Sequence, residues 1–439
     1  MAKKFLIIIF ILGAILRLVG ISQTPPGLTP DEAAFGYNAY SLLLTGRDEW
    51  GVPAWQLPFT NLQSFGDFKL PLYAFLSVPS VKLLGLTEYA VRLPNAILGS
   101  LSVLAIYMLA TRMFGSKTGL LAAILLAISP WSIQMSRGGF EANVATLFLP
   151  MAIYAYLSRR YFSSALFFAL GIYIYHSTRL LTLPVIAALY LFKPMKKFTP
   201  VILFACLVVP GVFSLLGSGS SRSSDLLIFH PTDNWKSVAD RRFQARVNGV
   251  PDATARIFSN KVVASLSTWY SNYIGYLSPY FLFVAGPSES TYGMIPGRGV
   301  LYSSDLALLL IFTILFIRRP HKNYLLLIVI ILLGFLPASL SKGVGFAANR
   351  TIIVLPFILI GLAQALKWLL QKNKFVTPLV SLIYLTHLVF FLYNYTVFSK
   401  TAIGEGMHIG KKELFERLMP IANNYPEVKI SRTLSNPHI

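Results

Sequence analysis

Long apolar segments alternate with short polar connections along most of the chain. A run of about 20 apolar residues can cross a bilayer as a helix, and tilt accommodates somewhat shorter or longer runs. The pattern predicts an all-α polytopic membrane protein with about eleven transmembrane helices. The predicted spans are 4–21, 89–111, 118–136, 143–158, 161–177, 179–193, 198–217, 304–318, 323–341, 350–370 and 376–398.

Basic residues mark every second connection between these spans. Clusters of Lys and Arg occur at 3–4, 112–117, 159–160, 193–197, 318–322 and 372–374. Cytoplasmic loops are enriched in Lys and Arg, so these connections are predicted to be cytoplasmic. We therefore expect a multi-pass protein of the plasma membrane, the inner membrane where a cell has two. Its N-terminus is expected to be cytoplasmic and its C-terminus extracytoplasmic.

The spans and their orientation divide the chain into four parts. Residues 1–217 are predicted to form an N-terminal membrane module that includes a folded first outer loop, 22–88. A large extracytoplasmic loop is expected at 218–303, C-terminal transmembrane helices at 304–398, and an extracytoplasmic tail at 399–439.

Both long outer loops interleave aromatic and apolar residues with polar ones, which is typical of helices at a membrane interface. The Gly-, Pro-, Ser- and Tyr-rich end of the second loop, 276–303, is expected to be an ordered irregular loop. The predicted loop helices are 31–45, 70–85, 233–248 and 253–275.

Composition narrows the class of protein further. Hydrophobic residues make up 55% and charged residues 13%, too few polar side chains to cover a soluble globule of this length. The net charge is +21, but the basic residues form small clusters between apolar runs, without the continuous face that nucleic acid requires. We expect membrane lipid, and no nucleic acid, as a partner. The single cysteine, Cys206, permits neither an internal disulfide nor a cysteine metal site.

Two acidic residues follow the first span in the string LTPDEAAFGYNAY. Asp31 and Glu32 can be ordinary first-turn residues of a helix capped by Thr29, where the helix dipole favours carboxylates. A carboxylate beside a lipid-facing cavity can also act as a general base, because partial desolvation raises its basicity. Both roles can hold together, so the loop 22–88 is the expected catalytic loop.

A third acid, Glu141 in SRGGFEANVA, begins the fourth span on the same predicted side. It too can be a simple helix N-terminal residue, and the two glycines before it allow close approach of other segments. Because these acids lie at equivalent depth on neighbouring outer loops, Asp31, Glu32 and Glu141 are the candidate catalytic residues.

Several cations lie on the predicted outer side, against the positive-inside tendency. Lys69, Arg92 and Arg350 are candidates for binding a phosphate, since Arg grips phosphate with a fork and Lys offers a point charge. Each could instead be a cation that snorkels to lipid headgroups. Further candidates for substrate contact are Tyr37, Arg137, His176 and Arg179.

Acids and cations of this kind suit the displacement of a polyprenyl phosphate from a sugar. A base accepts the proton of the incoming hydroxyl group, while positive charge stabilises the departing phosphate. The sequence contains no GxxxxGK[ST] loop for nucleotide phosphates, and no histidine spacing resembles a zinc site. We therefore expect a polyprenyl-phosphate sugar as donor substrate and no required cofactor or metal ligands, with a role for a divalent ion left open.

The sequence resembles the GT-C membrane glycosyltransferases related to glycosyltransferase family 39, which includes protein O-mannosyltransferases and aminoarabinose transferases acting on lipid A. The likeness is closest to bacterial members of unassigned acceptor, and it covers about the first 200 residues best. The strings that carry it are PPGLTPDEAAFGYNAYSLLLTGRDEWG, FGDFKLPLYAFLSVPSVKLLGLTEYAVRLPNAILG, LLAAILLAISPWSIQMSRGGFEAN and YLSPYFLFVAGP.

The resemblance implies a GT-C fold and inverting transfer from a polyprenyl-phosphate sugar in a cavity roofed by outer loops. By this likeness Asp31 matches the catalytic base, Glu32 is its neighbour, and Glu141 is the second-loop acid. Lys69 and Arg92 match phosphate partners. The chain lacks the large inserted outer domain of the mannosyltransferases, so its acceptor, a lipid, glycan or protein, stays unassigned.

Two other functions share this topology. A transporter or flippase of lipid-linked sugars would also have many spans, but the duplicated halves and mid-membrane ionisable residues typical of transporters are not evident. A glycan ligase or polymerase that uses a diphosphate-linked donor would share the basic outer loops. The donor that supports transfer distinguishes this enzyme from a monophosphate-dependent transferase.

Overall fold

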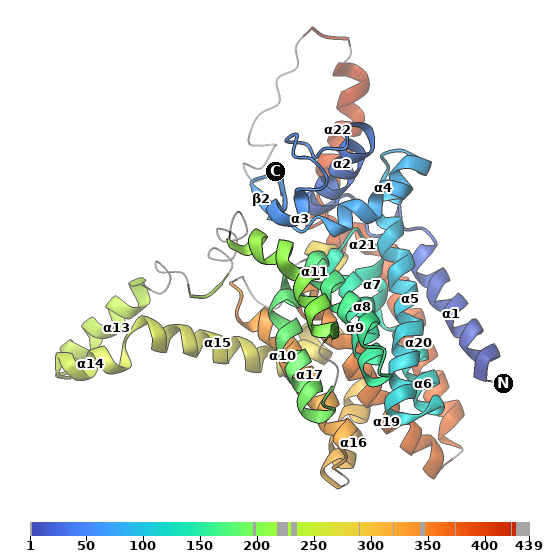
Figure 1. Ribbon diagram of the computed structural model, residues 1–439, viewed down its shortest axis with the longest axis vertical. Coiled ribbons are helices and arrows are strands. Elements are labelled where there is room, and N and C mark those ends of the chain that lie inside the picture. The colour runs from blue at the N-terminus through green and yellow to red at the C-terminus, as the bar shows by residue number, and fades with distance from the viewer. Residues whose placement is uncertain are drawn as a thin grey trace.

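The chain folds mainly into helices that run along one common direction (Figure 1). The computed structural model describes residues 2–195, 199–216, 227–229, 235–288, 290–318, 320–342, 347–373, 375–422 and 424–426. Within these residues one small sheet of two strands occurs, and the remaining regular elements are helical. The all-α polytopic prediction is confirmed in outline. Parts of the predicted 218–303 loop and the end of the 399–439 tail lie outside the described residues.

Each predicted span contains a helix. Among the described residues, five helices are long and apolar enough to cross a membrane, or six if the bent pair α6 and α7 counts as one span, so the predicted number of about eleven stays a prediction. The elements that lie in the predicted spans are α1 (Ala2–Leu18), α5 (Glu88–Phe114), α6 (Ser116–Ile128), α7 (Pro130–Ser136), α8 (Glu141–Leu157), α9 (Tyr161–Ile174), α10 (His176–Phe192), α11 (Thr199–Leu216), α16 (Asp305–Arg318), α17 (Lys322–Ser339), α18 (Ala348–Thr351), η3 (Ile352–Val354), α19 (Leu355–Lys372) and α20 (Val376–Val397).

The connections that carry the basic clusters gather at one end of the bundle. Arg112 donates a hydrogen bond of 2.7 Å to the carbonyl of Leu157, and Asn323 donates one of 2.7 Å to the carbonyl of Met113. The alternate connections lie at the opposite end, which also carries the first outer loop and which we call the Asp31 end. The alternation read from the sequence therefore describes the two ends of the bundle, while the orientation in a cell stays a prediction.

The first loop and the C-terminal helices cover the Asp31 end together. Lys412 forms an ion pair of 2.6 Å with Glu88 at the start of α5, and the carbonyl of Met407 leaves no room for a side chain at Gly27. The C-terminal segment is thus packed onto the first loop. The elements concerned are α2 (Pro30–Thr45), α3 (Leu57–Thr60), β1 (Leu62–Ser64), β2 (Asp67–Lys69), α4 (Leu72–Leu84), α21 (Ser399–Ile403) and α22 (Ile409–Ala422).

Helices α2 and α4 match the predicted loop helices 31–45 and 70–85, but the hairpin between them was not predicted. Strands β1 and β2 pair antiparallel, with Leu62 opposite Lys69. Phe65 and Gly66 form the turn with φ of 51° and 76°, the positive values that a two-residue type I′ turn needs at both positions. The hairpin delivers Lys69 to the start of α4.

The α6–α7 bend has a clear sequence cause. Pro130 has no N–H and starts a new helix, so the two helices meet at 58° and carbonyls at the end of α6 lose their helical partners. The fully buried guanidinium of Arg17 donates to the carbonyls of Leu126 and Ala127 at 2.8 and 3.0 Å. Arg17 thus supplies hydrogen-bond donors to the carbonyls at this break.

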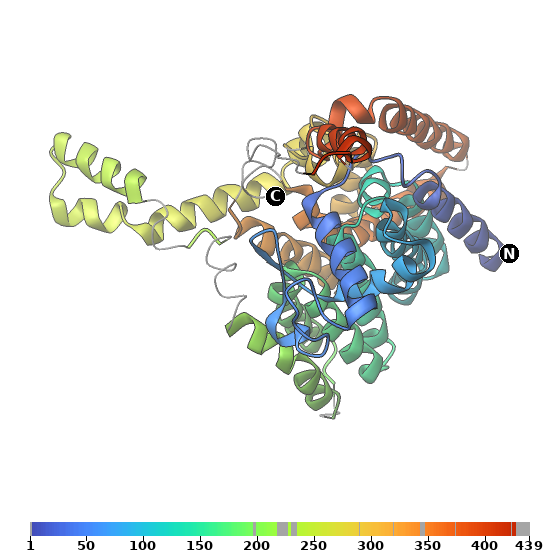
Figure 2. The ribbon, with the colours of Figure 1, turned by 90° about the horizontal axis from the view of Figure 1, so that it is seen from above.

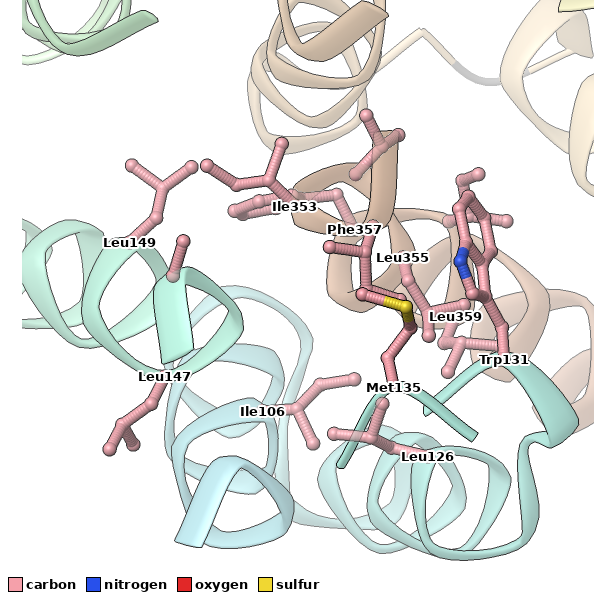
Figure 3. Packing of buried hydrophobic residues seen from close by; sticks show 14 of the residues in the cluster. Ile106, Leu126, Trp131, Met135, Leu147, Leu149, Ile353, Leu355, Phe357 and Leu359 are labelled. Carbon is pink, nitrogen blue, oxygen red and sulfur yellow. The ribbon is translucent and has the colours of Figure 1, made fainter. Parts of the chain in front are cut away.

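The largest apolar cluster runs through most of the bundle, and Figure 3 shows the part where α5, α6, α7, α8 and α19 meet. Trp131 on α7 is fully buried, and its Nε1 donates to the carbonyl of Ala348 at 3.2 Å. Burying side chains of this size stabilises a helix bundle by dense packing as well as by removal from water. The cluster fixes the start of α8, and with it Glu141, against the rest of the Asp31 end.

In the described part of the second long loop, three helices project from the bundle (Figures 1 and 2). The predicted helix 253–275 is two helices, because the side chain of Asn260 accepts a hydrogen bond from the N–H of Val263 and so caps a new start. The elements of this loop are α13 (Trp235–Val247), α14 (Asp252–Phe258), α15 (Lys261–Leu277), the π-helical turn η1 (Tyr280–Ala285) and the 3₁₀ turn η2 (Thr291–Gly293).

Candidate active site

Asp31 lies in the first turn of α2, and its carboxylate contacts side chains from two distant parts of the chain. Helix α2 begins here because the Thr29 hydroxyl caps it, accepting a hydrogen bond of 3.2 Å from the helix. Lys69 forms an ion pair with one carboxylate oxygen of Asp31, and the Tyr292 hydroxyl donates to the other at 3.1 Å. The Asp31 side chain keeps 22% of its surface exposed, so its carboxylate is accessible.

The Lys69 ammonium is nearly buried and lies between two acids. Besides Asp31, it approaches a carboxylate oxygen of Asp67 at 3.3 Å. Both acids and the lysine are held by elements that begin or end at the site, namely the hairpin and the start of α2. The arrangement supplies a fixed positive charge beside an accessible carboxylate.

Tyr292 occupies a backbone conformation that bulky residues rarely adopt. Its φ of 60° and ψ of 27° lie in the left-handed region, where a non-glycine residue typically stores about 1–3 kcal/mol of strain. Its ring packs edge-on against Phe140 at 5.4 Å between centroids, which helps to hold it. The negative charge of Asp31 raises the pKa of Tyr292 well above its usual value, with burial adding to the shift. The phenol therefore stays protonated and donates to Asp31.

A cavity of about 230 Å³ adjoins Tyr292 at the Asp31 end. One part of its wall is apolar, contributed by Leu180 on α10, Leu215 on α11 and Pro337 on α17. Leu180 and Leu215 are both partly exposed on the side of the bundle. The polar part of the wall is formed by Glu141, Tyr175, His176, Arg179, Tyr292 and Arg350.

Hydrogen bonds orient the two arginines of the cavity. Arg179 donates to the carbonyl of Ile172 and to the hydroxyl of Ser214, both at 3.0 Å. Arg350 donates to the hydroxyl of Ser341 at 2.6 Å. Two guanidinium groups beside an apolar wall suit an anionic group on an apolar stem.

Glu32 and Arg92 were candidates for catalysis and phosphate binding, but neither lines this cavity. Both are fully buried, and Arg92 Nε donates to Glu32 at 2.7 Å. The other N–H groups of Arg92 bind Glu32 again and the carbonyls of Ile21, Pro25 and Gly27 at 2.6–3.2 Å. A guanidinium has five N–H donors, and all five are used here. Arg92 is therefore a structural residue of the first loop, with no donor left for a phosphate.

Arg137 and Tyr37 also lie away from the cavity. Arg137 donates to the carbonyls of Leu16 and Thr24 and fixes the chain between α1 and α2. Tyr37 is half exposed and lines a separate hollow that includes Glu88. Of the sequence candidates, the fold gathers Glu141, His176, Arg179 and Arg350 around the cavity, with Asp31 and Lys69 adjoining it through Tyr292.

Sequence reasoning did not single out Tyr292, Tyr175 or Asn349, which also border the site. The only local signal for Tyr292 was the Tyr-Gly pair in a loop rich in turn residues, which is common in loops of every kind. Among the described residues, no group of three or more His, Cys, Asp or Glu side chains could hold a metal ion.

Solved structures and a family model show what the chain is similar to. It aligns with ArnT from Cupriavidus metallidurans bound to undecaprenyl phosphate over 95% of this chain and 73% of that one, with a TM-score of 0.52 and 13% identity. It aligns equally well, at TM-score 0.52 and 12% identity, with the archaeal oligosaccharyltransferase AglB from Archaeoglobus fulgidus in complex with an inhibitory peptide and a dolichol-phosphate. The chain has the GT-C fold.

The GT-C likeness extends over nearly the whole chain, but the chain is shorter than the proteins it resembles. It spans 60% of the ArnT chain solved in the apo state and 56% of the AglB chain, while covering 83% and 92% of its own length. Residues 69–215 match the family model described as dolichyl-phosphate-mannose-protein mannosyltransferase. No curated protein matches the sequence.

Proposed function

We propose that this GT-C chain is an inverting glycosyltransferase that moves a sugar from a polyprenyl-phosphate donor to an extracytoplasmic acceptor. The observation that carries the proposal is a cavity with an apolar side and a cationic, carboxylate-bearing side, adjoined by the Asp31–Lys69 pair. The ArnT and AglB structures, which contain undecaprenyl phosphate and a dolichol-phosphate, support a lipid-linked donor for the same fold.

The donor enters with its prenyl chain along the apolar wall and its phosphate toward the cations. Arg179 and Arg350 hold the phosphate oxygens, and Lys69 supplies positive charge from the Asp31 side. Glu141 and His176 contact the hydroxyl groups of the sugar or acceptor. Glu32 and Arg92 take no part in binding and instead fix the loop that leads to Asp31.

The reaction is a single displacement at the anomeric carbon. The acceptor hydroxyl oxygen forms a bond to that carbon, and the bond from the carbon to the phosphate oxygen breaks with its electron pair leaving on the phosphate. Asp31 accepts the hydroxyl proton, and the cations stabilise the charge that develops on the leaving group. Attack from the face opposite the phosphate inverts the anomeric configuration.

In the proposed orientation, the Asp31 end faces the extracytoplasmic side of the plasma membrane and the N-terminus is cytoplasmic. This follows from the clusters of Lys and Arg at the opposite end, because such clusters are retained in the cytoplasm. The acceptor, a lipid, glycan or protein, then meets the site from outside.

Purified protein assayed with matched sugar donors tests the proposal. We expect transfer or slow hydrolysis from a polyprenyl-monophosphate sugar, with release of the polyprenyl phosphate, and loss of that activity in Asp31→Asn. Turnover only with the diphosphate-linked donor would identify a ligase or polymerase instead. Movement of intact donor across vesicle membranes without cleavage would identify a transporter, and either result would overturn the proposed transferase.

A further inference from the structure

Helices α13, α14 and α15 form an arm, residues 235–277, that leaves the bundle at the Asp31 end. In Figure 1 the arm runs transverse to α5, and Figure 2 shows from above that it extends well beyond the other helices. Only the C-terminal part of α15 contacts the bundle closely, mainly along α17. In the middle of α15 the Ser265 hydroxyl still donates to the carbonyl of Ile228 at 3.4 Å, whereas α13 and α14 pack mainly within the arm in the described part of the chain.

One side of α15 attaches the arm, and a neighbouring side of the helix is bare. Asn272 donates to the carbonyl of Ser339 at 3.2 Å, and the Tyr273 hydroxyl donates to the carbonyl of Leu332 at 3.0 Å, which ties the helix to the outer part of α17. The bare face carries a stripe of apolar side chains at i, i+4 spacing that are 46% to 68% exposed. The stripe consists of Val262, Leu266, Tyr270 and Ile274.

The distal part of the arm is a braced helical hairpin. Arg242 on α13 donates to the carbonyl of Ser259 at 2.6 Å, and Asp252 pairs with Arg246 and Arg256 at 2.6 and 2.8 Å. The ion pairs hold the pKa of Asp252 below its usual value. This brace keeps several large apolar side chains exposed to the surroundings. These side chains are Trp235, Phe243, Val247, Ile257 and Phe258.

The charge of the arm indicates whether its surface suits the hydrocarbon interior of a bilayer or the headgroup boundary. The arm has six basic and two acidic residues, a net charge of +4, so it does not suit the hydrocarbon interior of a bilayer. Exposed apolar side chains interspersed with Lys and Arg are the combination that binds the headgroup boundary of an anionic membrane. The basic residues are Lys236, Arg241, Arg242, Arg246, Arg256 and Lys261.

The bilayer is also the partner that the position of the arm favours. The arm runs transverse to the bundle helices (Figure 1), and α15 is tied to the Ser339 end of α17, so the arm lies parallel to the plane of a membrane that those helices cross. We propose that the arm binds the surface of the bilayer, with its apolar stripe at the headgroup and acyl-chain boundary and its cations on anionic headgroups.

The inference is independent of the proposed enzymatic activity and can be tested on the full chain. Cys206→Ser removes the one native cysteine, and Leu266→Cys then carries a single nitroxide label in nanodiscs. Oxygen and a water-soluble nickel chelate report whether the label lies in lipid or water. Matched labels at Leu385→Cys on the membrane helix α20 and Phe415→Cys on α22 provide the lipid and water references, since both side chains are exposed.

We expect the Leu266 label to resemble the Leu385 reference, with low access for nickel and high access for oxygen. A label as accessible to nickel as the Phe415 reference would show that the arm stands in water and would overturn the proposal. Dipolar broadening between labels of two copies would identify self-association through the stripe, which would overturn it as well.

The anionic preference is tested separately with a label at Phe243→Cys near the tip. Nickel access should be lower in nanodiscs of equal parts phosphatidylglycerol and phosphatidylcholine than in phosphatidylcholine alone. Lys236→Gln with Arg241→Gln should remove most of this difference, because each cation near an anionic surface is worth about a fivefold change in binding. The matched control, Lys400→Gln with Arg417→Gln, removes two cations outside the arm and should change nothing. Equal access in both lipids would overturn the headgroup assignment.

Discussion

Asp31 and Glu32 are neighbours in one helical turn, yet they occupy opposite environments. The Asp31 side chain is 22% exposed beside the cavity, whereas Glu32 is fully buried. Successive helical residues point about 100° apart, so one acid can face a site while the next faces the core. Of two adjacent carboxylates at the start of a helix, one can therefore face a site while the other stabilises the fold.

The buried acid is the better satisfied of the two. Glu32 accepts hydrogen bonds from Arg92, from the N–H of Thr29 at 3.0 Å and from the N–H of Gly139 at 2.8 Å. A buried ion pair contributes little net stability relative to an apolar pair, but losing one partner leaves a costly buried charge. Through Arg92 this pair also gathers carbonyls of the segment before α2. Glu32 thus holds in place the segment from which Asp31 projects.

Neutralising each acid separately tests whether Asp31 and Glu32 have different roles. Asp31→Asn is expected to lower kcat by about 10²–10⁴-fold, the usual contribution of a general base, while thermal stability stays close to that of the wild type. Initial rates with a polyprenyl-monophosphate sugar and melting in detergent measure the two quantities. Wild-type turnover by the variant would remove Asp31 from the mechanism.

Glu32→Gln should show the opposite signature. Removing the carboxylate leaves the Arg92 charge buried without a counter-charge, which typically costs about 3–5 kcal/mol of stability. The double variant Glu32→Gln with Arg92→Met should recover part of this loss, because it removes both charges together. Thermal or denaturant unfolding of the variants measures the coupling. If the single and double variants melted alike, the pair would not be a unit.

Cations at the cavity should affect activity, whereas a cation at the opposite end of the bundle should not. Arg179→Gln and Arg350→Gln are each expected to lower kcat/KM by about 10–10²-fold, the worth of a hydrogen bond to a charged group, with little change in melting. Lys372→Gln at the opposite end of the bundle is the matched control. The affinity for the donor lipid, measured by competition with polyprenyl phosphate, should fall together with kcat/KM. Unchanged affinity in both arginine variants would place the phosphate elsewhere.

The smallest expected effect concerns the hydrogen bond from Tyr292 to Asp31. Tyr292→Phe should lower the rate by about tenfold, the lower end of the range for a hydrogen bond to a charged group, because Lys69 still holds the other oxygen of Asp31. Since the charge of Asp31 raises the pKa of Tyr292, the phenol is protonated through the neutral range. The variant should therefore reduce the height of the pH–rate profile without moving its limbs at neutral pH. A shifted limb would mean that Tyr292 itself titrates.

The prediction from sequence succeeded where the physics is local or periodic. Apolar segments marked the bundle helices, and Thr29 with the acids after it marked the start of α2. It was less successful for the ends of loop elements. The hairpin before Lys69 is only three residues per strand, and its turn uses Phe65 at positive φ, which sequence preferences do not favour. The capped break at Asn260 was missed because helical spacing continues across it.

Thus the sequence by itself determined the helical membrane class, the alternation of basic connections and the set of acids and cations from which a site could be drawn. Only the tertiary structure decided which of them meet. It turned Arg92 inward onto five oxygens, brought Tyr292 from 261 residues away to Asp31, and left Arg179 and Arg350 on one cavity wall. The reason is physical: hydrophobicity and capping act over a few residues, whereas the partners of a charged side chain are fixed by packing between distant segments.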